Sequence, residues 1–186
     1  ALAGATGAVV VLEPATGDVL AMASSPAGRL DGSAADYAVL VADRVRNPLL
    51  NRAVCQVYSP GSAFKPLVAV AALSSGTVSR NAGFSCAGAF RYGRHRVGCW
   101  RPGGHGRLDF AGALEQSCNG AFCEMAARLG PDPIAETAEA FGLGHRTGIG
   151  LPGEAAGIVP SPEWKRASVS LPEDDRRWWP GDTFNL

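Results

Sequence analysis

Ser62 and Lys65 stand three positions apart and form a pair that could do chemistry together. A serine hydroxyl is a poor nucleophile near neutral pH, but an amine whose pKa is lowered by burial can take its proton. Residues three apart on a helix share one face, so the two side chains would lie within reach of each other. The pair predicts acyl transfer with Ser62 as nucleophile and Lys65 as base. The simpler alternative is that Ser62 only caps a helix and Lys65 extends to solvent.

Pro66 indicates where the helix that carries this pair begins. Proline lacks the N–H that a helix interior needs and is tolerated only in about the first turn. The sequence therefore predicts a helix from about Ser62 through Leu73, ended by Gly76. Ser62 then lies at a helix N-terminus, where the peptide dipoles favour a developing negative charge. Apolar neighbours on both sides of Lys65 would bury its amine.

Lysine is scarce in this chain. Of its 17 basic residues 15 are arginine, and Lys65 and Lys165 are the two lysines. Arginine cannot lose its proton in a protein, so a lysine at position 65 is consistent with a need for a deprotonable amine. Lys165 lies among charged neighbours and is expected at the surface.

Ser117 and Asn119 form a second polar cluster, in a stretch that interrupts a helical pattern. A lysine-based acyl-transfer enzyme needs a proton carrier for the leaving amine and a polar group that orients the substrate. A hydroxyl and an amide in one exposed turn supply both. The alternative is an ordinary N-cap for the helix that follows, because serine and asparagine are preferred there.

Three cysteines and one histidine have a spacing that could hold a metal. They are Cys86, Cys99, His105 and Cys118, in the pattern C-x12-C-x5-H-x12-C. Three thiolates and one imidazole suit tetrahedral zinc, and the glycine-rich loop around the histidine could bring it to a fixed point. Free thiols and a Cys86–Cys99 disulfide are the alternatives. Cys55 and Cys123 are expected to be small buried apolar residues.

Composition limits the class of protein. The chain has 186 residues, 46% hydrophobic and 18% charged, which fits one globular domain with a core. A net charge of zero argues against a protein that tracks nucleic-acid phosphates. The pattern predicts a strand hairpin over residues 7–24, an irregular region with one or two short strands over 81–106, and helices near 109–116, 121–129 and 132–141. The apolar strands are expected to be covered on both faces.

Several motifs together resemble a known family. Residues 58–66 (YSPGSAFKP) resemble the nucleophile motif of penicillin-binding protein transpeptidases, and residues 117–122 (SCNGAF) resemble its second motif. Residues 147–154 and 160–166 are similar to the class B branch, within it to the elongation-type penicillin-binding protein 2 group. The resemblance covers essentially the whole chain.

The resemblance implies a fold and a mechanism. The fold would be α/β (α+β), a penicillin-binding-protein/β-lactamase-like transpeptidase domain with an antiparallel sheet flanked by helices. Ser62 would attack the D-Ala-D-Ala carbonyl of a peptidoglycan stem peptide, with Lys65 as base, Ser117 as proton relay and Asn119 holding the donor. A β-lactam would acylate Ser62, and the Ser62 N–H would form half of the oxyanion hole.

The resemblance also implies partners and a location. No cofactor is expected for catalysis, but some relatives carry a metal at the place of the four cysteine and histidine residues. The full-length protein would act on the periplasmic side of the bacterial inner membrane, with a membrane glycan polymerase of the elongation machinery as partner.

The family's third motif, K-T-G on a strand, does not occur in residues 1–186. The chain is therefore expected to be a partial transpeptidase domain without its C-terminal K-T-G strand, pedestal and membrane anchor, and to be weakly active or inactive alone. Two alternatives stay open: a serine β-lactamase or β-lactam sensor domain, and a zinc-stabilised scaffold without catalytic activity.

Overall fold

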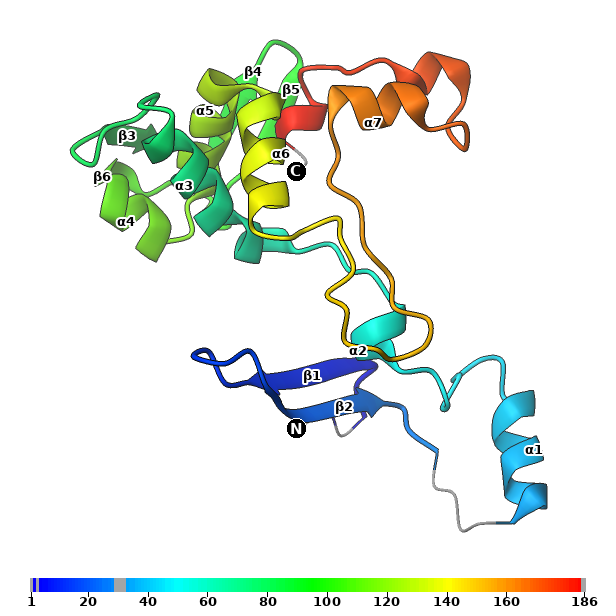
Figure 1. Cartoon of the computed structure of the whole chain (residues 1–186). Coiled ribbons are helices and arrows are strands. Elements are labelled where there is room, and N and C mark those ends of the chain that lie inside the picture. Colours follow the sequence, from blue (N-terminus) through cyan, green and yellow to red (C-terminus); the bar gives the residue numbers. More distant parts are fainter. Residues whose placement is uncertain (1, 3, 29–32, 185–186) are drawn as a thin grey trace. The chain divides into compact units, whose positions relative to one another are not determined.

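The computed structural model describes residue 2, residues 4–28 and residues 33–184 (Figure 1). The chain divides into two compact units. Unit 1 comprises residues 1–58 and 146–156, and unit 2 comprises residues 59–145 and 157–186. Among the described helices, none combines the length and apolar character that crossing a bilayer requires.

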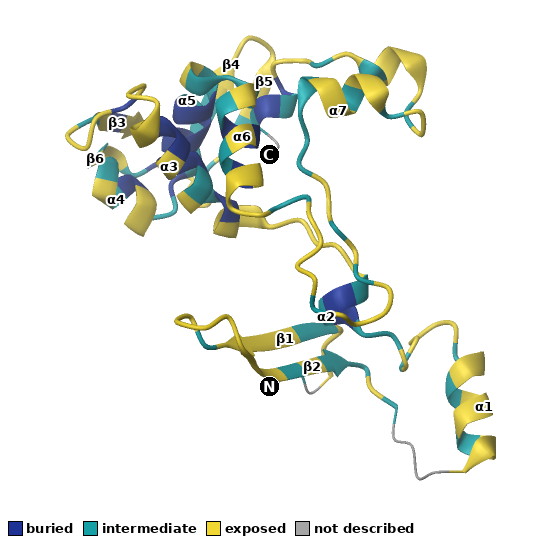
Figure 2. Cartoon of the chain, viewed as in Figure 1, coloured by how far each residue is buried: buried dark blue, intermediate teal, exposed yellow. Residues whose placement is uncertain are grey.

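Unit 1 is built on a hairpin. Strands β1 (Gly7–Leu12) and β2 (Val19–Ser25) pair antiparallel, which confirms the predicted hairpin. Helix α2 (Arg52–Cys55) packs against both strands. Unit 1 also contains helix α1 (Ala34–Ala42). The expected coverage of both strand faces is wrong for the described residues, because little of unit 1 besides α2 packs on the hairpin and its valines stay exposed (Figure 2).

Unit 2 contains the main core, formed by helices. The predicted helix from Ser62 begins as a 3-10 turn (Gly61–Phe64) and continues as α3 (Lys65–Ser74), with Pro66 in the first turn as expected. Helix α3 packs against α5 (Asn119–Leu129) and α6 (Pro131–Ala140). Their contact surfaces are apolar and buried (Figure 2), including Ala72, Met125 and Ile134. Helix α4 (Phe110–Glu115) is capped by the Asp109 side chain.

The region between α3 and α4 holds four strands rather than one or two. Strand β3 (Gly83–Cys86) pairs antiparallel with β6 (Gly106–Asp109), and β4 (Ala89–Tyr92) pairs antiparallel with β5 (His95–Gly98). Each strand has only four residues, too few for a clear alternating pattern in a glycine-rich sequence. The predicted mixed fold with helices and antiparallel sheets is confirmed.

The last part of unit 2 corrects the expectation for Lys165. Helix α7 (Pro162–Ala167) is followed by 3-10 turns at Glu173–Arg176 and Asp182–Phe184. The Lys165 side chain is only 14% exposed, whereas its neighbours Glu163 and Arg166 form an exposed pair with each other. The charged neighbours therefore misled the prediction, because they lie on the solvent side of α7 and Lys165 does not.

Candidate active site

The four predicted catalytic residues lie together in unit 2. Ser62 is in the 3-10 turn, Lys65 is the first residue of α3, and Ser117 and Asn119 flank the N-terminus of α5. The packing of α3 on α5 brings these two stretches together, 55 positions apart in sequence. Ser62, Lys65 and Asn119 line a cavity of about 280 Å³.

The Lys65 amine is the centre of the cluster. Its Nζ donates to Ser62 Oγ at 3.1 Å and to Ser117 Oγ at 2.9 Å. It also donates at 2.7 Å to the Ser117 carbonyl oxygen and at 2.7 Å to Asn119 Oδ1. All four partners are neutral oxygens, and in the described part of the chain no carboxylate forms an ion pair with Lys65.

These four oxygens differ in what they can do. The carbonyl of Ser117 and the amide oxygen of Asn119 can only accept hydrogen bonds, whereas the two hydroxyls can also donate. A neutral amine has two N–H groups and one lone pair. When the two accepting oxygens take both N–H groups, the lone pair is left facing the hydroxyls of Ser62 and Ser117. The geometry thus suits an amine that takes a proton from one hydroxyl and returns it through the other.

Burial changes the pKa of the Lys65 amine. Desolvation lowers the pKa of Lys65 below the ordinary lysine value of 10.5, because an ammonium loses hydration in the cavity. The neighbouring thiols of Cys99, Cys118 and Cys123 act in the opposite direction only when they are ionised. A lowered pKa increases the fraction of neutral amine near neutral pH, which is the form that can act as a base.

The two capping alternatives are wrong. No side-chain capping bond is made at the start of the 3-10 turn or of α3, where Pro60 and Phe64 are the cap residues. Cys118 is the N-cap of α5, also without a side-chain capping bond. Ser117 instead has φ of 47°, a left-handed conformation that costs a non-glycine residue free energy. This backbone aims both its hydroxyl and its carbonyl at Lys65.

Asn119 joins the site to a strand. Its Nδ2 donates to the Gly98 carbonyl at 2.9 Å, which turns Oδ1 toward Lys65. The strand residue Val97 lines the cavity, as do Phe122, Thr183 and Phe184. These wall residues were not predicted as site residues. Apolar side chains carry no chemical signature in a sequence, and only the spacing of Phe122 three positions after Asn119 could have suggested its place.

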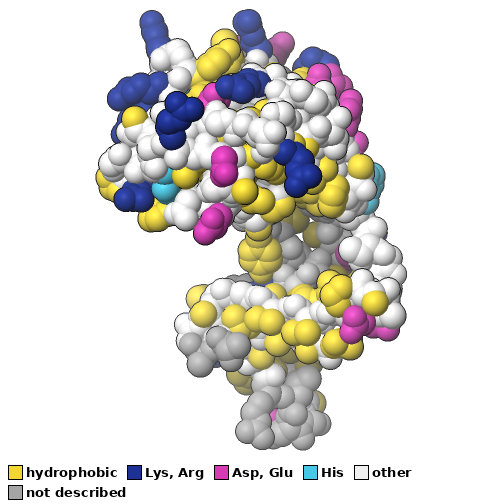
Figure 3. All heavy atoms as spheres, turned by 90° about the vertical axis from the view of Figure 1, so that its left-hand side faces the viewer, with side chains coloured by type: hydrophobic (Ala, Val, Ile, Leu, Met, Phe, Trp, Pro, Cys, Tyr) yellow, Lys and Arg dark blue, Asp and Glu magenta, His cyan; other side chains and the backbone are white. Residues whose placement is uncertain are grey.

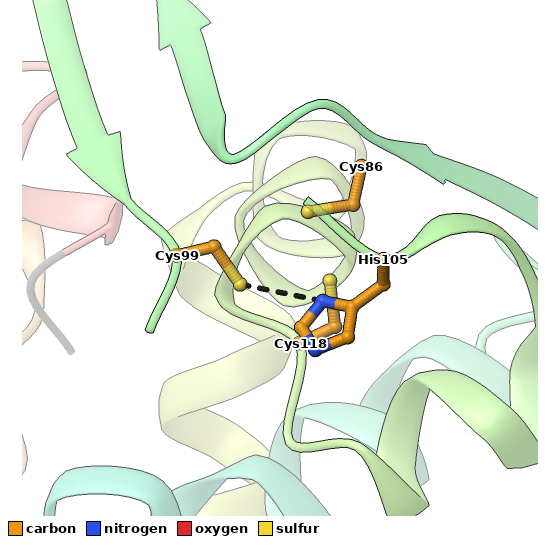
Figure 4. Close-up of side chains that lie close together, drawn as sticks. All are labelled: Cys86, Cys99, His105 and Cys118. Atoms are coloured by element: carbon orange, nitrogen blue, oxygen red, sulfur yellow. Dashed lines mark hydrogen bonds between the residues drawn. The ribbon is translucent and has the colours of Figure 1, made fainter. Parts of the chain in front are cut away.

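The predicted metal ligands also converge. One ligand atom from each of Cys86, Cys99, His105 and Cys118 lies within 4.8 Å of all the others. Figure 4 shows the four side chains directed toward one another, with Cys99 Sγ 3.5 Å from His105 Nδ1. Sulfur ligands at the zinc–sulfur bond length of about 2.3 Å are separated by about 3.8 Å in a tetrahedron. The cluster is therefore the right size for one tetrahedral ion.

Two glycines allow this convergence. A Cβ on Gly88 would lie 2.0 Å from the Pro102 carbonyl, and a Cβ on Gly104 would lie 2.1 Å from the Cys86 carbonyl. Both glycines have positive φ, 91° and 78°. Only residues without a side chain let these two loops cross so closely, and the crossing brings His105 to the cysteines.

The thiols of the cluster are not equivalent. Burial raises the pKa of Cys118 to about 11. Burial also acts to raise the pKa of Cys99, but backbone N–H groups of Arg101, Gly120 and Asn119 outweigh it and leave the pKa below its ordinary value. Among the described residues all five cysteines are free thiols, so the Cys86–Cys99 disulfide is not present. Cys123 is buried, as expected, although it also lines the cavity. The same expectation is wrong for Cys55, which is only partly buried, with its Sγ 3.6 Å from the Pro152 carbonyl oxygen.

Comparison with known proteins places this chain in a family. The model of the penicillin binding protein transpeptidase domain matches residues 7–172. The chain belongs to the penicillin-binding protein transpeptidase family. It is 41% identical over 190 residues to the peptidoglycan D,D-transpeptidase MrdA of Escherichia coli K12, covering 98% of this chain and 29% of that protein.

Solved penicillin-binding protein structures have the same fold. The crystal structure of Pseudomonas aeruginosa PBP2 in complex with WCK 5153 gives a TM-score of 0.87 at 35% identity, over 98% of this chain and 40% of that one. Helicobacter pylori PBP2, solved in complex with MreC, gives a TM-score of 0.85 at 28% identity, over 96% of this chain and 34% of that one. The predicted family is confirmed. The chain spans less than a third of the length of its E. coli relative.

Proposed function

We propose that the full-length protein is a peptidoglycan D,D-transpeptidase that cross-links stem peptides through an acyl-enzyme on Ser62 during cell-wall elongation. The observation that carries the proposal is the Lys65 amine within hydrogen-bond distance of both Ser62 Oγ and Ser117 Oγ. The similarity to MrdA supports the reaction and substrate class. The β-lactamase and scaffold alternatives are not favoured, because the relatives are transpeptidases.

In the first half-reaction, Ser62 Oγ attacks the carbonyl carbon of the penultimate D-alanine while its proton passes to Lys65 Nζ. The tetrahedral intermediate collapses, the carbon–nitrogen bond breaks, and the ester to Ser62 forms. The departing D-alanine amine takes the proton from Lys65 through the Ser117 hydroxyl. The Ser62 N–H contributes to the oxyanion hole, and the Asn119 amide holds the donor peptide.

In the second half-reaction, the amine of a neighbouring stem peptide attacks the ester carbonyl. Its proton returns through Ser117 and Lys65 to Ser62 Oγ as the ester bond breaks, which leaves a new peptide bond and free Ser62. A β-lactam acylates Ser62 by the same first steps. Its ring-opened amine remains attached to the acyl group, so the acyl-enzyme is a dead end.

The charge of the surrounding segment agrees with an anionic substrate. Residues 77–108 contain six arginines and no acidic residue, although the whole chain has no net charge. In Figure 3, Lys and Arg side chains are spread over one face of unit 2, with Asp and Glu side chains between them. Strand β5 belongs to this segment and lines the cavity through Val97. Stem peptides carry carboxylates, which guanidinium groups bind well.

The test is labelling of the full-length protein with a fluorescent penicillin, followed by mass spectrometry. We expect the mass of one acyl group on Ser62 and no label on the Ser62→Ala variant. A protein that gains no mass would refute the proposal and favour the scaffold alternative. Rapid turnover of nitrocefin would favour a β-lactamase. We also propose that residues 1–186 are part of one transpeptidase domain and label weakly by themselves.

We further propose that Cys86, Cys99, His105 and Cys118 hold a structural zinc. The donor set fits: the four ligand atoms converge, and the His105 ring has a buried nitrogen, Nε2, that no described protein atom hydrogen-bonds. A bound zinc would stabilise the thiolates and fix Cys118 between Ser117 and Asn119, with no part in the proton transfers. Metal analysis of anaerobically purified protein should give one zinc per chain, and none in a Cys86→Ser/Cys118→Ser variant.

Location and partners follow from the same family. We propose that the protein works on the periplasmic side of the inner membrane, together with a membrane glycan polymerase. The solved complex of Helicobacter pylori PBP2 with MreC, and a solved peptidoglycan synthase complex that coordinates polymerization and crosslinking, support such assemblies for its relatives. Co-purification of the full-length protein from solubilised membranes with a polymerase would test this. Recovery of the protein alone from the soluble fraction would contradict it.

A further inference from the structure

Lys165 takes part in a second network of partly buried polar contacts, separate from the four predicted catalytic residues. Its Nζ lies 2.6 Å from Asp182 Oδ2, and the two side chains are 14% and 29% exposed. The same ammonium lies 5.9 Å from the centre of the Trp178 ring. An ion pair with this little solvent around it is screened much less than a surface pair, so its loss has a larger effect.

Asp182 connects this ion pair to the backbone that follows α7. Its Oδ2 also accepts from the Trp179 N–H at 2.7 Å, and its own N–H donates to the Trp179 carbonyl at 2.9 Å. Trp178 Nε1 donates to Thr183 Oγ1 at 3.1 Å. These bonds fold residues 178–183 into one tight turn with the Lys165 ammonium bound to its carboxylate.

The turn leads directly into the wall of the catalytic cavity. Thr183 is 6% exposed and lines the cavity together with Phe184. The Phe184 ring meets Phe90 and Tyr92 of β4 edge-on, with ring centres 5.2 and 5.3 Å apart. The position of this wall relative to Ser62 therefore depends on a turn held by Lys165.

We propose that the Lys165–Asp182 ion pair positions the Thr183–Phe184 wall and so controls how tightly the acyl donor is held beside Ser62. Both are positioning residues, since neither lines the cavity. The inference rests on the proposed function, because it concerns the donor of that reaction.

The test measures acylation of the full-length protein by a fluorescent penicillin over a range of concentrations. This separates the half-saturation concentration from the limiting rate. For Lys165→Met and Asp182→Asn we expect the half-saturation concentration to rise about tenfold and the limiting rate to stay within about threefold, because the bonds between Lys65 and Ser62 are untouched. The double variant should be no worse than either single variant, since both remove one interaction.

Arg166→Met is the matched control. Arg166 lies on the same helix next to Lys165 and pairs with exposed Glu163, so this variant should label like the wild type. The inference is overturned if Lys165→Met and Asp182→Asn also label like the wild type. It is equally overturned if the limiting rate falls as much as the apparent affinity, because the effect would then be a general loss of the folded site.

Hydrogen exchange of the same full-length variants tests the positioning role of the Lys165–Asp182 pair separately from the proposed transpeptidase function. We expect faster exchange of the backbone amides of residues 182–184 in Lys165→Met than in Arg166→Met. Unchanged exchange would overturn the positioning role whatever the labelling shows. If the wild type takes no label at all, the proposed function fails together with the claim about donor binding, and faster exchange would support only the positioning of the wall.

Discussion

The two lysines of this chain have surroundings of opposite chemical character. Lys65 faces four neutral oxygens, from Ser62, Ser117 and Asn119, and its charge has no carboxylate partner among the described residues. Lys165 faces the carboxylate of Asp182 at 2.6 Å and the ring of Trp178. Both side chains are largely removed from water, so burial alone does not distinguish a base from a structural cation.

The two amines differ in their hydrogen-bond partners. Neutral oxygens solvate an ammonium less well than water does, so desolvation prevails and the pKa of Lys65 is lowered. A carboxylate at hydrogen-bond distance compensates the charge of Lys165 and makes the ammonium part of the fold. The proposed function therefore uses one lysine as proton carrier, whereas the other forms an ion pair within the fold.

The largest expected effect comes from replacing each lysine by arginine in the full-length protein. Arginine keeps the charge but cannot give up its proton. Lys65→Arg should lower the rate of acylation by a fluorescent penicillin by about 10³-fold, within the range of a lost general base. Lys165→Arg should lower it by no more than about fivefold, because its partner needs only a positive charge. Similar losses in the two variants would contradict the comparison.

Asn119→Asp would give Lys65 the kind of partner that Lys165 has. A carboxylate 2.7 Å from the amine favours the ammonium and raises the pKa of Lys65. In the wild type, the acylation rate should rise about tenfold per pH unit as the pH approaches the lowered pKa, because the neutral amine is the base. In Asn119→Asp this rise should move to higher pH, with about 10–100-fold slower acylation at pH 7. An unchanged pH profile would show that Lys65 is not the titrating group.

Metal removal should affect the surroundings of Lys65 and leave the contacts of Lys165 unchanged. The four cysteine and histidine ligands include Cys118, next to the oxygens that face Lys65, whereas the contacts of Lys165 lie elsewhere in unit 2. A zinc ion present at about 1,000 times its Kd stabilises the folded domain by about 4 kcal/mol. A strong chelator should therefore lower the Tm of this domain by about 8–16 °C. We also expect acylation to slow about tenfold. Zinc should restore both values, and a Cys86→Ser/Cys118→Ser variant should not respond to chelator.

The smallest effect is expected on stability at α7. Lys165→Met leaves the Asp182 carboxylate unpaired at 29% exposure and should lower the free energy of unfolding by about 1–2 kcal/mol, between the values for surface and buried pairs. Arg166→Met should change it by less than about 0.5 kcal/mol, because its pair with Glu163 is exposed. Calorimetry of the full-length variants measures both. Equal values would mean that the Lys165 pair behaves as a surface pair.

Local sequence determined the parts of the site that depend on a few neighbouring residues. Pro66 placed the start of α3 and so put Ser62 and Lys65 on one turn, and the break at residues 117–119 marked the second cluster. The spacing of three cysteines and a histidine predicted a cluster whose ligand atoms do converge. In each case the chemistry requires polar or sulfur-bearing residue types, which a sequence displays directly.

Tertiary structure alone decided which distant groups meet. The four short strands between residues 83 and 109 have too few residues for a period to be visible. Thr183 and Phe184 line the cavity although no motif in the sequence connects them with Ser62. The opposite roles of the two lysines also depend on side chains 17 positions away or more in sequence, Asp182 for one and Ser117 for the other. Electrostatic environment is a property of three-dimensional neighbours, so the sequence identified the amines and the fold determined what each of them does.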